Sequence, residues 1–174
     1  MLTADHDFGR PSAFLVRNIS LLPPGRILDI AMGRGRDALY LAKKGFSVEG
    51  VDISAEAVGE AVERSLRAGF PIKGTVADLE KGYPIQPETY EVIICFHYLQ
   101  RSLFPEIKSG LKKGGVVVYE TFTLEQRRFG KPRNPDFLLR KGELREVFGD
   151  FECLRYREGI INNSRAIASI IARK

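Results

Sequence analysis

The chain has 174 residues, of which 44% are hydrophobic and 28% charged, values typical of a folded globular protein and not of a disordered chain. This length suits one domain with one buried core, and the apolar runs are far too short to span a membrane. The net charge of +5 is uneven: residues 1–100 contain 11 lysines and arginines against 13 acids, and residues 101–174 contain 16 against 9.

The chain begins with an acidic, polar stretch, residues 1–10, that we expect to be a mobile arm. This stretch lacks the apolar segment of a signal peptide. Cys95 and Cys153 are isolated, which favours two reduced thiols over a disulfide framework or a metal site. We therefore expect a cytoplasmic protein with no metal and no membrane partner.

Predicted helices and strands alternate after this arm. Proline, serine and glycine residues mark the ends of helices predicted over residues 11–22, 36–44, 54–68, 100–111 and 141–148. Short apolar runs predict strands over residues 26–30, 46–51, 72–76, 90–96 and 116–121. Residues 112–115, Lys-Lys-Gly-Gly, read as the basic last turn of the fourth helix followed by glycines that end it.

Five alternations of strand and helix predict a parallel sheet with helices on both faces. Two further strands, 151–156 and 166–172, are joined by turn residues at 158–159 and 162–164, too few for a crossover helix, so we expect an antiparallel hairpin. The predicted fold class is α/β: a Rossmann-like doubly wound sheet of five parallel strands plus a C-terminal antiparallel hairpin, seven strands in all. We expect a single domain over residues 1–174, with a basic loop insertion at 123–141.

The first strand ends in a glycine turn. Gly33 and Gly35 allow a sharp bend and close approach of the backbone to a ligand, and the N-terminus of the next helix faces the same place. The segment also fits the dinucleotide pattern G-x-G-x-x-G/A, with Asp52 19 residues beyond Gly33. A lone match of this kind leaves the nature of the cofactor open.

Three features weigh against a dinucleotide. Asp29 lies inside the first strand, where a carboxylate would repel a pyrophosphate but suit an ammonium group. Asp78 follows the third strand, where it can accept from an adenine amino group. A dehydrogenase also needs a substrate domain, for which 174 residues leave no room.

Five segments carry a resemblance to a known family. Residues 27–35, 51–54, 76–79, 90–95 and 110–118 resemble, in this order, the first, second, third, fourth and post-fourth motifs of class I S-adenosylmethionine-dependent methyltransferases. Residues 35–42 are most similar to the small bacterial and archaeal methyltransferases related to tellurite resistance. The resemblance implies S-adenosylmethionine as cofactor and S-adenosylhomocysteine as product.

The resemblance also implies cofactor-binding roles for residues at the strand ends. These are Asp29, Ala31, Gly33, Gly35, Asp52, Ile53, Asp78, Leu79, Cys95 and Phe96. It implies that Asp52 binds the ribose hydroxyls and Asp78 the adenine amino group. One position departs from the family, because Ala31 replaces the usual first glycine; we expect a slightly displaced turn and retained binding.

Candidates for chemistry follow the fourth and fifth strands. Methyl transfer depends mainly on alignment, so no catalytic base is required. His97 and Glu120 are the candidate catalytic residues, with Tyr98, Arg101 and Thr121 nearby, although His97 is equally plausible as a packing residue. Asp5, His6 and Phe8 are candidates for a lid over the site.

The acceptor is expected to be a small molecule or small anion. The chain lacks the Pro-Pro motif of amino-nitrogen methylases after the fourth strand and the Pro-Cys dipeptide of cytosine methylases. Two alternatives stay open: a nucleic-acid or protein methyltransferase that uses the basic segment 126–133, and a non-catalytic cofactor-binding protein. Nucleic acid is the less favoured partner, and no feature indicates an oligomeric state.

Overall fold

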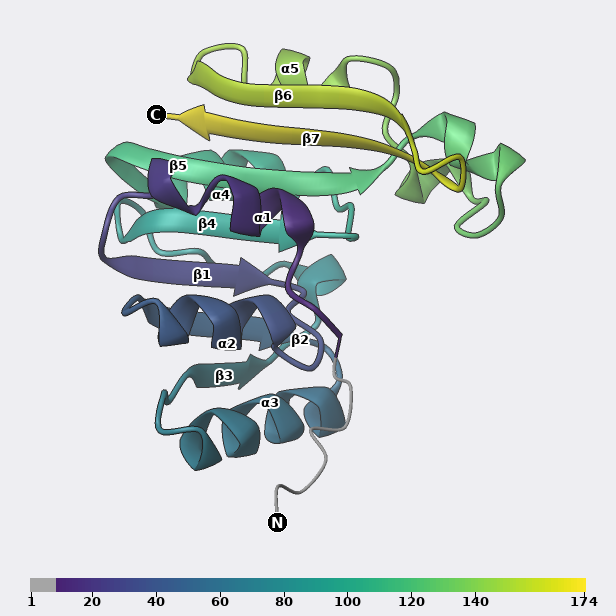
Figure 1. Ribbon diagram of the computed structural model, residues 1–174. Coiled ribbons are helices and arrows are strands. Elements are labelled where there is room, and N and C mark those ends of the chain that lie inside the picture. Colours follow the sequence, from purple (N-terminus) through teal and green to yellow (C-terminus); the bar gives the residue numbers. More distant parts are fainter. Residues whose placement is uncertain (1–8) are drawn as a thin grey trace.

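The computed structural model describes residues 9–174. Its centre is a seven-stranded sheet with the order β3-β2-β1-β4-β5-β7-β6 (Figure 1). The strands are β1 Arg26–Ile30, β2 Ser47–Asp52, β3 Lys73–Val76, β4 Tyr90–Phe96, β5 Leu111–Phe122, β6 Glu152–Ile161 and β7 Arg165–Arg173. Strands β1 to β5 are parallel and β7 is antiparallel to both of its neighbours, which confirms the predicted fold class.

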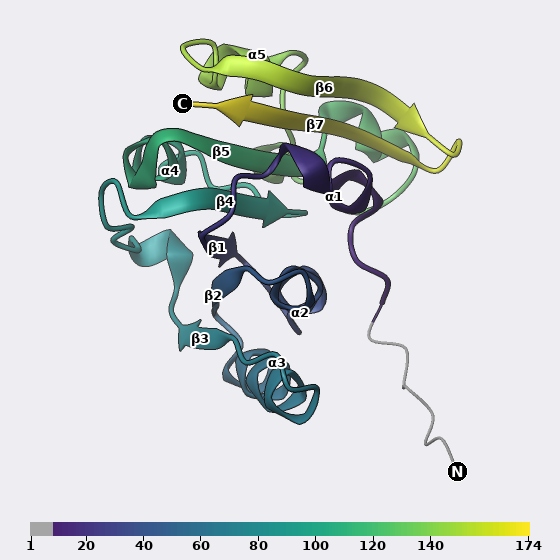
Figure 2. The same ribbon diagram turned by 60° about the vertical axis from the view of Figure 1, so that its left-hand side comes forward.

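Helices cover both faces of the sheet. The α-helices are α1 Ala13–Arg17, α2 Arg36–Lys43, α3 Ala55–Arg67, α4 Leu103–Gly110 and α5 Glu143–Val147. Short 3-10 helices are η1 Ile19–Leu21, η2 Leu79–Lys81, η3 Leu124–Arg128 and η4 Pro135–Phe137. Helices α1, α2 and α3 lie on one face, and α4 and α5 lie on the other (Figures 1 and 2).

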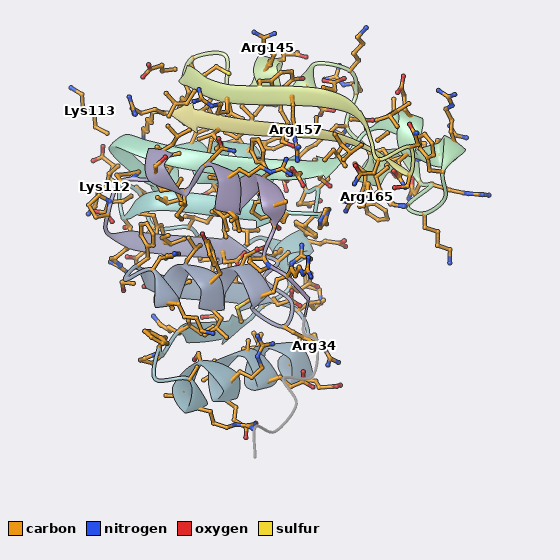
Figure 3. All side chains as sticks on the ribbon, viewed as in Figure 1. Arg34, Lys112, Lys113, Arg145, Arg157 and Arg165 are labelled. Carbon is orange, nitrogen blue, oxygen red and sulfur yellow. The ribbon has the colours of Figure 1, made fainter. Side chains whose placement is uncertain are left out.

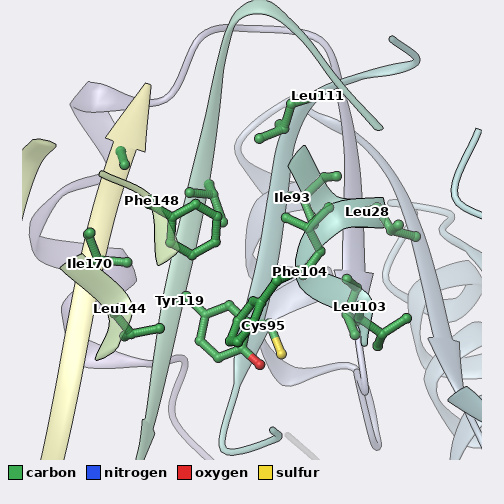
Figure 4. Packing of buried hydrophobic residues seen from close by; sticks show 14 of the residues in the cluster. Leu28, Ile93, Cys95, Leu103, Phe104, Leu111, Tyr119, Leu144, Phe148 and Ile170 are labelled. Carbon is green, nitrogen blue, oxygen red and sulfur yellow. The ribbon is translucent and has the colours of Figure 1, made fainter. Parts of the chain in front are cut away.

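Two hydrophobic cores follow from this layering. Side chains alternate along β4, so Val92 and Ile94 pack under α1 and α2, whereas Ile93 and Cys95 pack under α4 and α5. Figure 4 shows the second of these cores, where the ring of Phe104 lies 5.5 Å from that of Tyr119. With both faces buried, the central strands are mostly apolar, and Asp29 in β1 and Glu120 in β5 are exceptions.

Helix ends differ from the prediction at two places. The helix predicted over residues 11–22 divides into α1 and η1 at Asn18, whose side-chain amide donates to the carbonyl of Phe14 at 2.8 Å. The prediction that residues 112–115 form the last turn of α4 is wrong. Leu111 already pairs with Tyr90, so these residues belong to β5, where the pairing is irregular.

The terminal hairpin is longer than predicted. Glu158 and Gly159 are not part of its turn, because they pair with Ala168 and Ile167 inside β6 and β7. The turn is made by residues 162–164, where Asn162 and Asn163 both have a φ of 52°. Asparagine tolerates this left-handed conformation better than other non-glycine residues.

The predicted arm and lid residues at positions 1–8 lie outside the described residues. Within residues 9–174, no helix has the length and apolar character needed to cross a membrane. The same residues contain no group of three or more histidine, cysteine or acidic side chains placed to hold a metal ion.

Candidate functional site

The carboxyl ends of β1 and β4 lie side by side at the right-hand edge of the sheet in Figure 1. The chain leaves β1 toward β2 and leaves β4 toward β5 on the opposite side, which makes this edge the topological switch point where ligands bind in such folds. Ala31 follows β1 with a φ of 55°, and His97 follows β4 with a φ of 58°. Left-handed non-glycine residues cluster at functional sites, so the strain marks the same place.

The two glycines of the first turn have different surroundings. Gly33 has a φ of 54°, and a Cβ built on it would meet nothing within 4 Å. A Cβ on Gly35 would lie 2.7 Å from the Cβ of Ala61 in α3. Gly33 therefore faces open space, whereas Gly35 is needed for close packing of two helices.

Ala31 adopts the left-handed conformation that usually requires glycine. An alanine in this region costs about 1–2 kcal/mol. The next residue anchors the turn, because the Met32 amide donates to the carbonyl of Val51 at 3.1 Å. The Met32 sulfur occupies the space that a side chain on Gly50 would fill. The turn is thus formed without the first glycine of the family pattern.

Asp52 ties this turn to the end of β2. Its carboxylate accepts from the Gly33 amide at 2.8 Å and from the Ser54 amide at 3.0 Å, one bond on each oxygen. A carboxylate can accept about four hydrogen bonds, so about two acceptor positions remain. Ile53 beside it is 65% exposed, which is unusual for an isoleucine. A polar group and an apolar side chain are thus both presented at the same edge.

Asp78 follows the neighbouring strand β3. One carboxylate oxygen accepts from the Glu80 amide at 3.0 Å, and the other lies 3.3 Å from the ammonium of Lys81. Leu79 is buried in the core, which fixes the start of η2. Since the Ala77 amide donates to the Asp52 carbonyl at 3.0 Å, the two acidic residues are held at adjacent strand ends.

Asp29 lies beneath the turn and is 3% exposed. Burial raises its pKa well above the usual range, and the nearby carboxylate of Asp37 raises it further. Asp37 is itself buried and accepts from the amide of Ser12 at 2.6 Å and from its hydroxyl at 2.8 Å. This clasp joins the segment before α1 to the N-terminus of α2. No local sequence signal pairs residues 12 and 37.

Two of the predicted cofactor-site residues at the end of β4 are core residues. Phe96 and Cys95 are buried on opposite faces of the sheet. Burial raises the pKa of the Cys95 thiol to about 12, which keeps it protonated and excludes it as a nucleophile. Only their backbone is available to a ligand.

His97 is the first residue after β4 to reach a cavity. Its ring stacks on that of Phe122, with centroids 5.2 Å apart and an interplanar angle of 28°. Its Nδ1 atom is buried and has no hydrogen-bond partner within residues 9–174. Burial lowers its pKa, as does the positive charge of Arg36, so the imidazole is neutral at neutral pH.

The cavity has a volume of about 690 Å³, a size typical of small-molecule sites. Its wall combines η2, the loop after β4, the end of β5 and the basic loop. The lining residues are Glu80, His97, Tyr98, Leu99, Phe122, Lys131, Pro132, Arg133, Asn134 and Phe137. The sequence singled out the basic segment, but it contained no signal that Lys131 and Arg133 face the same cavity as His97.

Arg101 holds the basic loop in place. Its guanidinium donates twice to the Glu143 carboxylate, at 2.6 and 2.9 Å, and to the carbonyls of Asp136 and Leu138 at 2.9 and 3.0 Å. Glu143 is 2% exposed. Burial alone would raise the pKa of Glu143, but the hydrogen bonds from Arg101 and the Arg140 amide outweigh it and lower the pKa. Arg101 is thus occupied with structural contacts.

Glu120 lies away from the cavity. Its side chain points to the α1 face because side chains alternate along β5. Its carboxylate accepts from the Ser169 hydroxyl at 2.6 Å and from Arg157, which is labelled in Figure 3, at 3.0 Å. The guanidinium of Arg157 in turn lies 4.9 Å from the ring centroid of Phe14 in α1. The structure therefore gives Glu120 a partly buried ion pair, and Glu120 is not among the residues that line the cavity.

The comparison with known families decides the identity of the fold. Residues 27–115 match the family described as "Methyltransferase domain". The chain belongs to this family. The match confirms the resemblance to class I S-adenosylmethionine-dependent methyltransferases that the five motifs predicted.

Curated relatives of this methyltransferase domain have diverse names. It is 26% identical over 149 residues to "Hemagglutinin 1" of Eikenella corrodens, covering 82% of this chain and 49% of that protein. It is 33% identical over 101 residues to a ubiquinone biosynthesis O-methyltransferase of Burkholderia orbicola, covering 55% of this chain and 44% of the enzyme. A ribosomal RNA small subunit methyltransferase C of Alcanivorax borkumensis is 33% identical over 103 residues, 54% of this chain and 31% of that enzyme. The chain thus spans about half the length of these relatives or less.

Solved structures agree on the fold. TehB from Haemophilus influenzae superposes with a TM-score of 0.78 at 23% identity, over 94% of this chain and 62% of TehB. A geranyl diphosphate C-methyltransferase from Streptomyces coelicolor, solved with S-adenosylhomocysteine, superposes with a TM-score of 0.72 at 16% identity, over 92% of this chain and 79% of the enzyme.

Proposed function

We propose that this chain transfers a methyl group from S-adenosylmethionine to a small-molecule acceptor. The observation that carries the proposal is the pairing of two features at one sheet edge. Open acidic strand ends lie on the β2–β3 side, and a cavity that accommodates a small molecule lies on the β4–β5 side. His97 and its strained backbone stand where the two features meet.

The residues present fit the cofactor. Gly33 leaves room for close approach, and Asp52 keeps acceptor positions for a pair of ribose hydroxyls. The exposed side chain of Ile53 gains a partner when a flat adenine covers it. Asp78 stands one strand further along as an acceptor for the adenine amino group. Asp29, Ala31 and Gly35 shape the turn, and Leu79, Cys95 and Phe96 contribute backbone.

Alignment is the main contribution of the chain to catalysis. When bound, S-adenosylmethionine supplies an electrophilic methyl group: the acceptor forms a bond to that carbon as the carbon–sulfur bond breaks, and its electron pair passes to sulfur. The protein residues hold the acceptor in line and exclude water. We assign His97 as the group that receives the proton of an acceptor hydroxyl or thiol, because it lines the cavity and is neutral at neutral pH. We assign Glu120 a structural role.

Titration calorimetry tests the cofactor assignment. We expect S-adenosylmethionine and S-adenosylhomocysteine to bind and NAD not to bind; binding of NAD alone would overturn the proposal. The Ile53→Ala variant should lose about 1 kcal/mol of cofactor affinity with no change in melting temperature, because its side chain is exposed in the free protein. Leu66→Ala is the matched control, since Leu66 is also exposed but lies on α3 outside the site residues.

A further inference from the structure

We infer that the acceptor is an organic anion with a flat apolar body, such as an aromatic carboxylate that carries a thiol or hydroxyl group. The inference rests on the proposed function and names the substrate class of the same site. It assigns the body of the acceptor to the apolar wall of the cavity and its anionic group to Lys131 and Arg133.

The apolar wall excludes a bare oxyanion as the best ligand. Leu99, Phe122, Pro132 and Phe137 line the cavity from three separate segments of the chain. Phe137 is 47% exposed, and a large aromatic side chain left uncovered at a cavity rim gains free energy when a ligand buries it. An anion of a few atoms would fill a small part of about 690 Å³ and would leave this wall wet.

The opposite charges on the cavity come from different segments of the chain. Lys131 and Arg133 come from the basic loop, and neither forms an ion pair within residues 9–174. Glu80 lies on η2, at the β3 side, close to Asp78. An anionic group is therefore attracted to the loop end and repelled from the η2 end. This separation orients an elongated acceptor with its reactive end toward the switch point.

The basic loop is held rigidly, which suits a pocket for a small ligand. The buried Gln126 side chain donates to the carbonyl of Lys131 at 3.1 Å and accepts from the amide of Ala166 in β7 at 2.9 Å. Arg101 fixes the other end of the loop through the carbonyls of Asp136 and Leu138. The two cations thus stand on an anchored wall.

Much of the basic charge outside the cavity lies away from it. Figure 3 shows Lys112 and Lys113 at the left-hand edge of the sheet, opposite the carboxyl ends of β1 and β4, Arg145 at the top, and Arg34 and Arg165 at the right. Arg127 and Arg128, in the same segment as Lys131, are exposed and absent from the cavity lining. The basic charge is thus divided among the cavity, its side of the sheet and more distant surface sites.

A labelled-methyl assay with matched acceptors tests the inference. We would compare 2-mercaptobenzoate and 4-hydroxybenzoate with their methyl esters, with tellurite, and with a single-stranded RNA oligonucleotide. We expect the carboxylates to be methylated with a KM at least about tenfold below that of the esters, which corresponds to one charge-assisted hydrogen bond. Preferred methylation of tellurite, of RNA or of the esters would overturn the inference.

Variants of the basic segment show which residues lower the KM for the carboxylates. Lys131→Ala/Arg133→Ala should raise the KM for the carboxylates about tenfold and leave the KM for the esters unchanged. Arg127→Ala/Arg128→Ala is the matched control in the same segment and should change neither. Equal effects of both double variants would point to a diffuse electrostatic surface and contradict the inference. Phe137→Ala should raise the KM for carboxylates and esters alike.

Cofactor binding separates the two possible failures. If calorimetry shows S-adenosylmethionine binding but the tested aromatic acids are not methylated, the acceptor class is wrong, whereas the cofactor assignment of the proposed function stands. If S-adenosylmethionine does not bind to the folded protein, the proposed function itself is wrong.

Discussion

The two halves of the site are built in different ways. On the β1–β3 side, each predicted cofactor residue lies within a few residues of a strand end. Asp52, for example, accepts a bond from Ser54 at its own strand end and one from Gly33 at the end of the neighbouring strand. On the β4–β5 side, the cavity wall depends on contacts between distant segments, such as Arg101 with Glu143 and Gln126 with Ala166. The residues that we assign to the cofactor are thus positioned by strand ends and their turns, and the cavity that we assign to the acceptor is formed by contacts between distant segments.

The largest loss of stability is expected when the contacts of Arg101 that hold the cavity wall are removed. Arg101→Met leaves the buried Glu143 carboxylate without its guanidinium, and we expect a loss of about 3 kcal/mol in the free energy of unfolding. Acceptor turnover should fall while S-adenosylmethionine affinity stays within about twofold, because no β1–β3 contact changes. Chemical denaturation and calorimetry measure the two quantities.

Arg173→Met is the control for this variant. It breaks the exposed Arg173–Glu152 ion pair, 3.1 Å long, and should cost less than about 1 kcal/mol. If Arg101→Met weakens cofactor binding as much as it slows turnover, the two halves of the site are coupled and the comparison fails.

The second-largest effect is expected on the β1–β3 side of the site. Asp52→Ala removes a charged acceptor of hydrogen bonds, and we expect S-adenosylmethionine affinity to fall by about 1.5–3 kcal/mol. The variant also frees the amides of Gly33 and Ser54, so thermal unfolding must be recorded beside calorimetry. Unchanged cofactor affinity in a folded variant would mean that the β2 end is misassigned.

A smaller effect of opposite sign is expected at Asp29. Its pKa is raised by burial and by the carboxylates of Asp37 and Asp52. Arg36 lowers it, but the net result is a rise. At a pH above the unfolded pKa of about 3.9, the folded state therefore retains a proton that the unfolded state releases. The free energy of unfolding consequently falls as the pH rises from this value toward the higher pKa of the folded state. Asp29→Asn should remove this loss.

Unfolding curves at several pH values check this prediction. Asp29→Asn should be more stable than the original chain at pH 8, and the difference should shrink toward pH 4. A stability difference that does not depend on pH would contradict a raised pKa.

The smallest effect is expected at Ala31. Ala31→Gly relieves the strain of a left-handed alanine but increases the freedom of the unfolded chain, so stability should change by less than about 1 kcal/mol. Cofactor affinity should stay the same if the turn is already in its binding conformation. A large gain in affinity would show that the alanine displaces the turn, as the sequence led us to expect.

The same division explains what the sequence could predict. The strands, the parallel order and the hairpin follow from apolar runs and turn residues, and positions such as Gly33 and Asp52 follow from motif spacing. The face of Glu120 could not be predicted, because the apolar run from Val116 to Tyr119 before it is buried on both faces of the sheet and shows no alternation. Lys131 and Arg133 could not be placed either, since the position of their loop depends on long-range contacts, from Gln126 to Ala166 and from Arg101 to Leu138.

The bridge between Thr123 and Leu139 gives the basic loop one more property. Both ends of the segment meet at the end of β5, where the Leu124 amide donates to the Leu139 carbonyl at 3.0 Å and the Leu139 amide donates to the Phe122 carbonyl at 2.9 Å. A segment whose ends already touch can be exchanged for one of another length at little cost in closure entropy. Residues 124–138 can therefore be replaced as one unit by a loop from another protein. Such a replacement would change the range of acceptors without altering the residues that we assign to the cofactor.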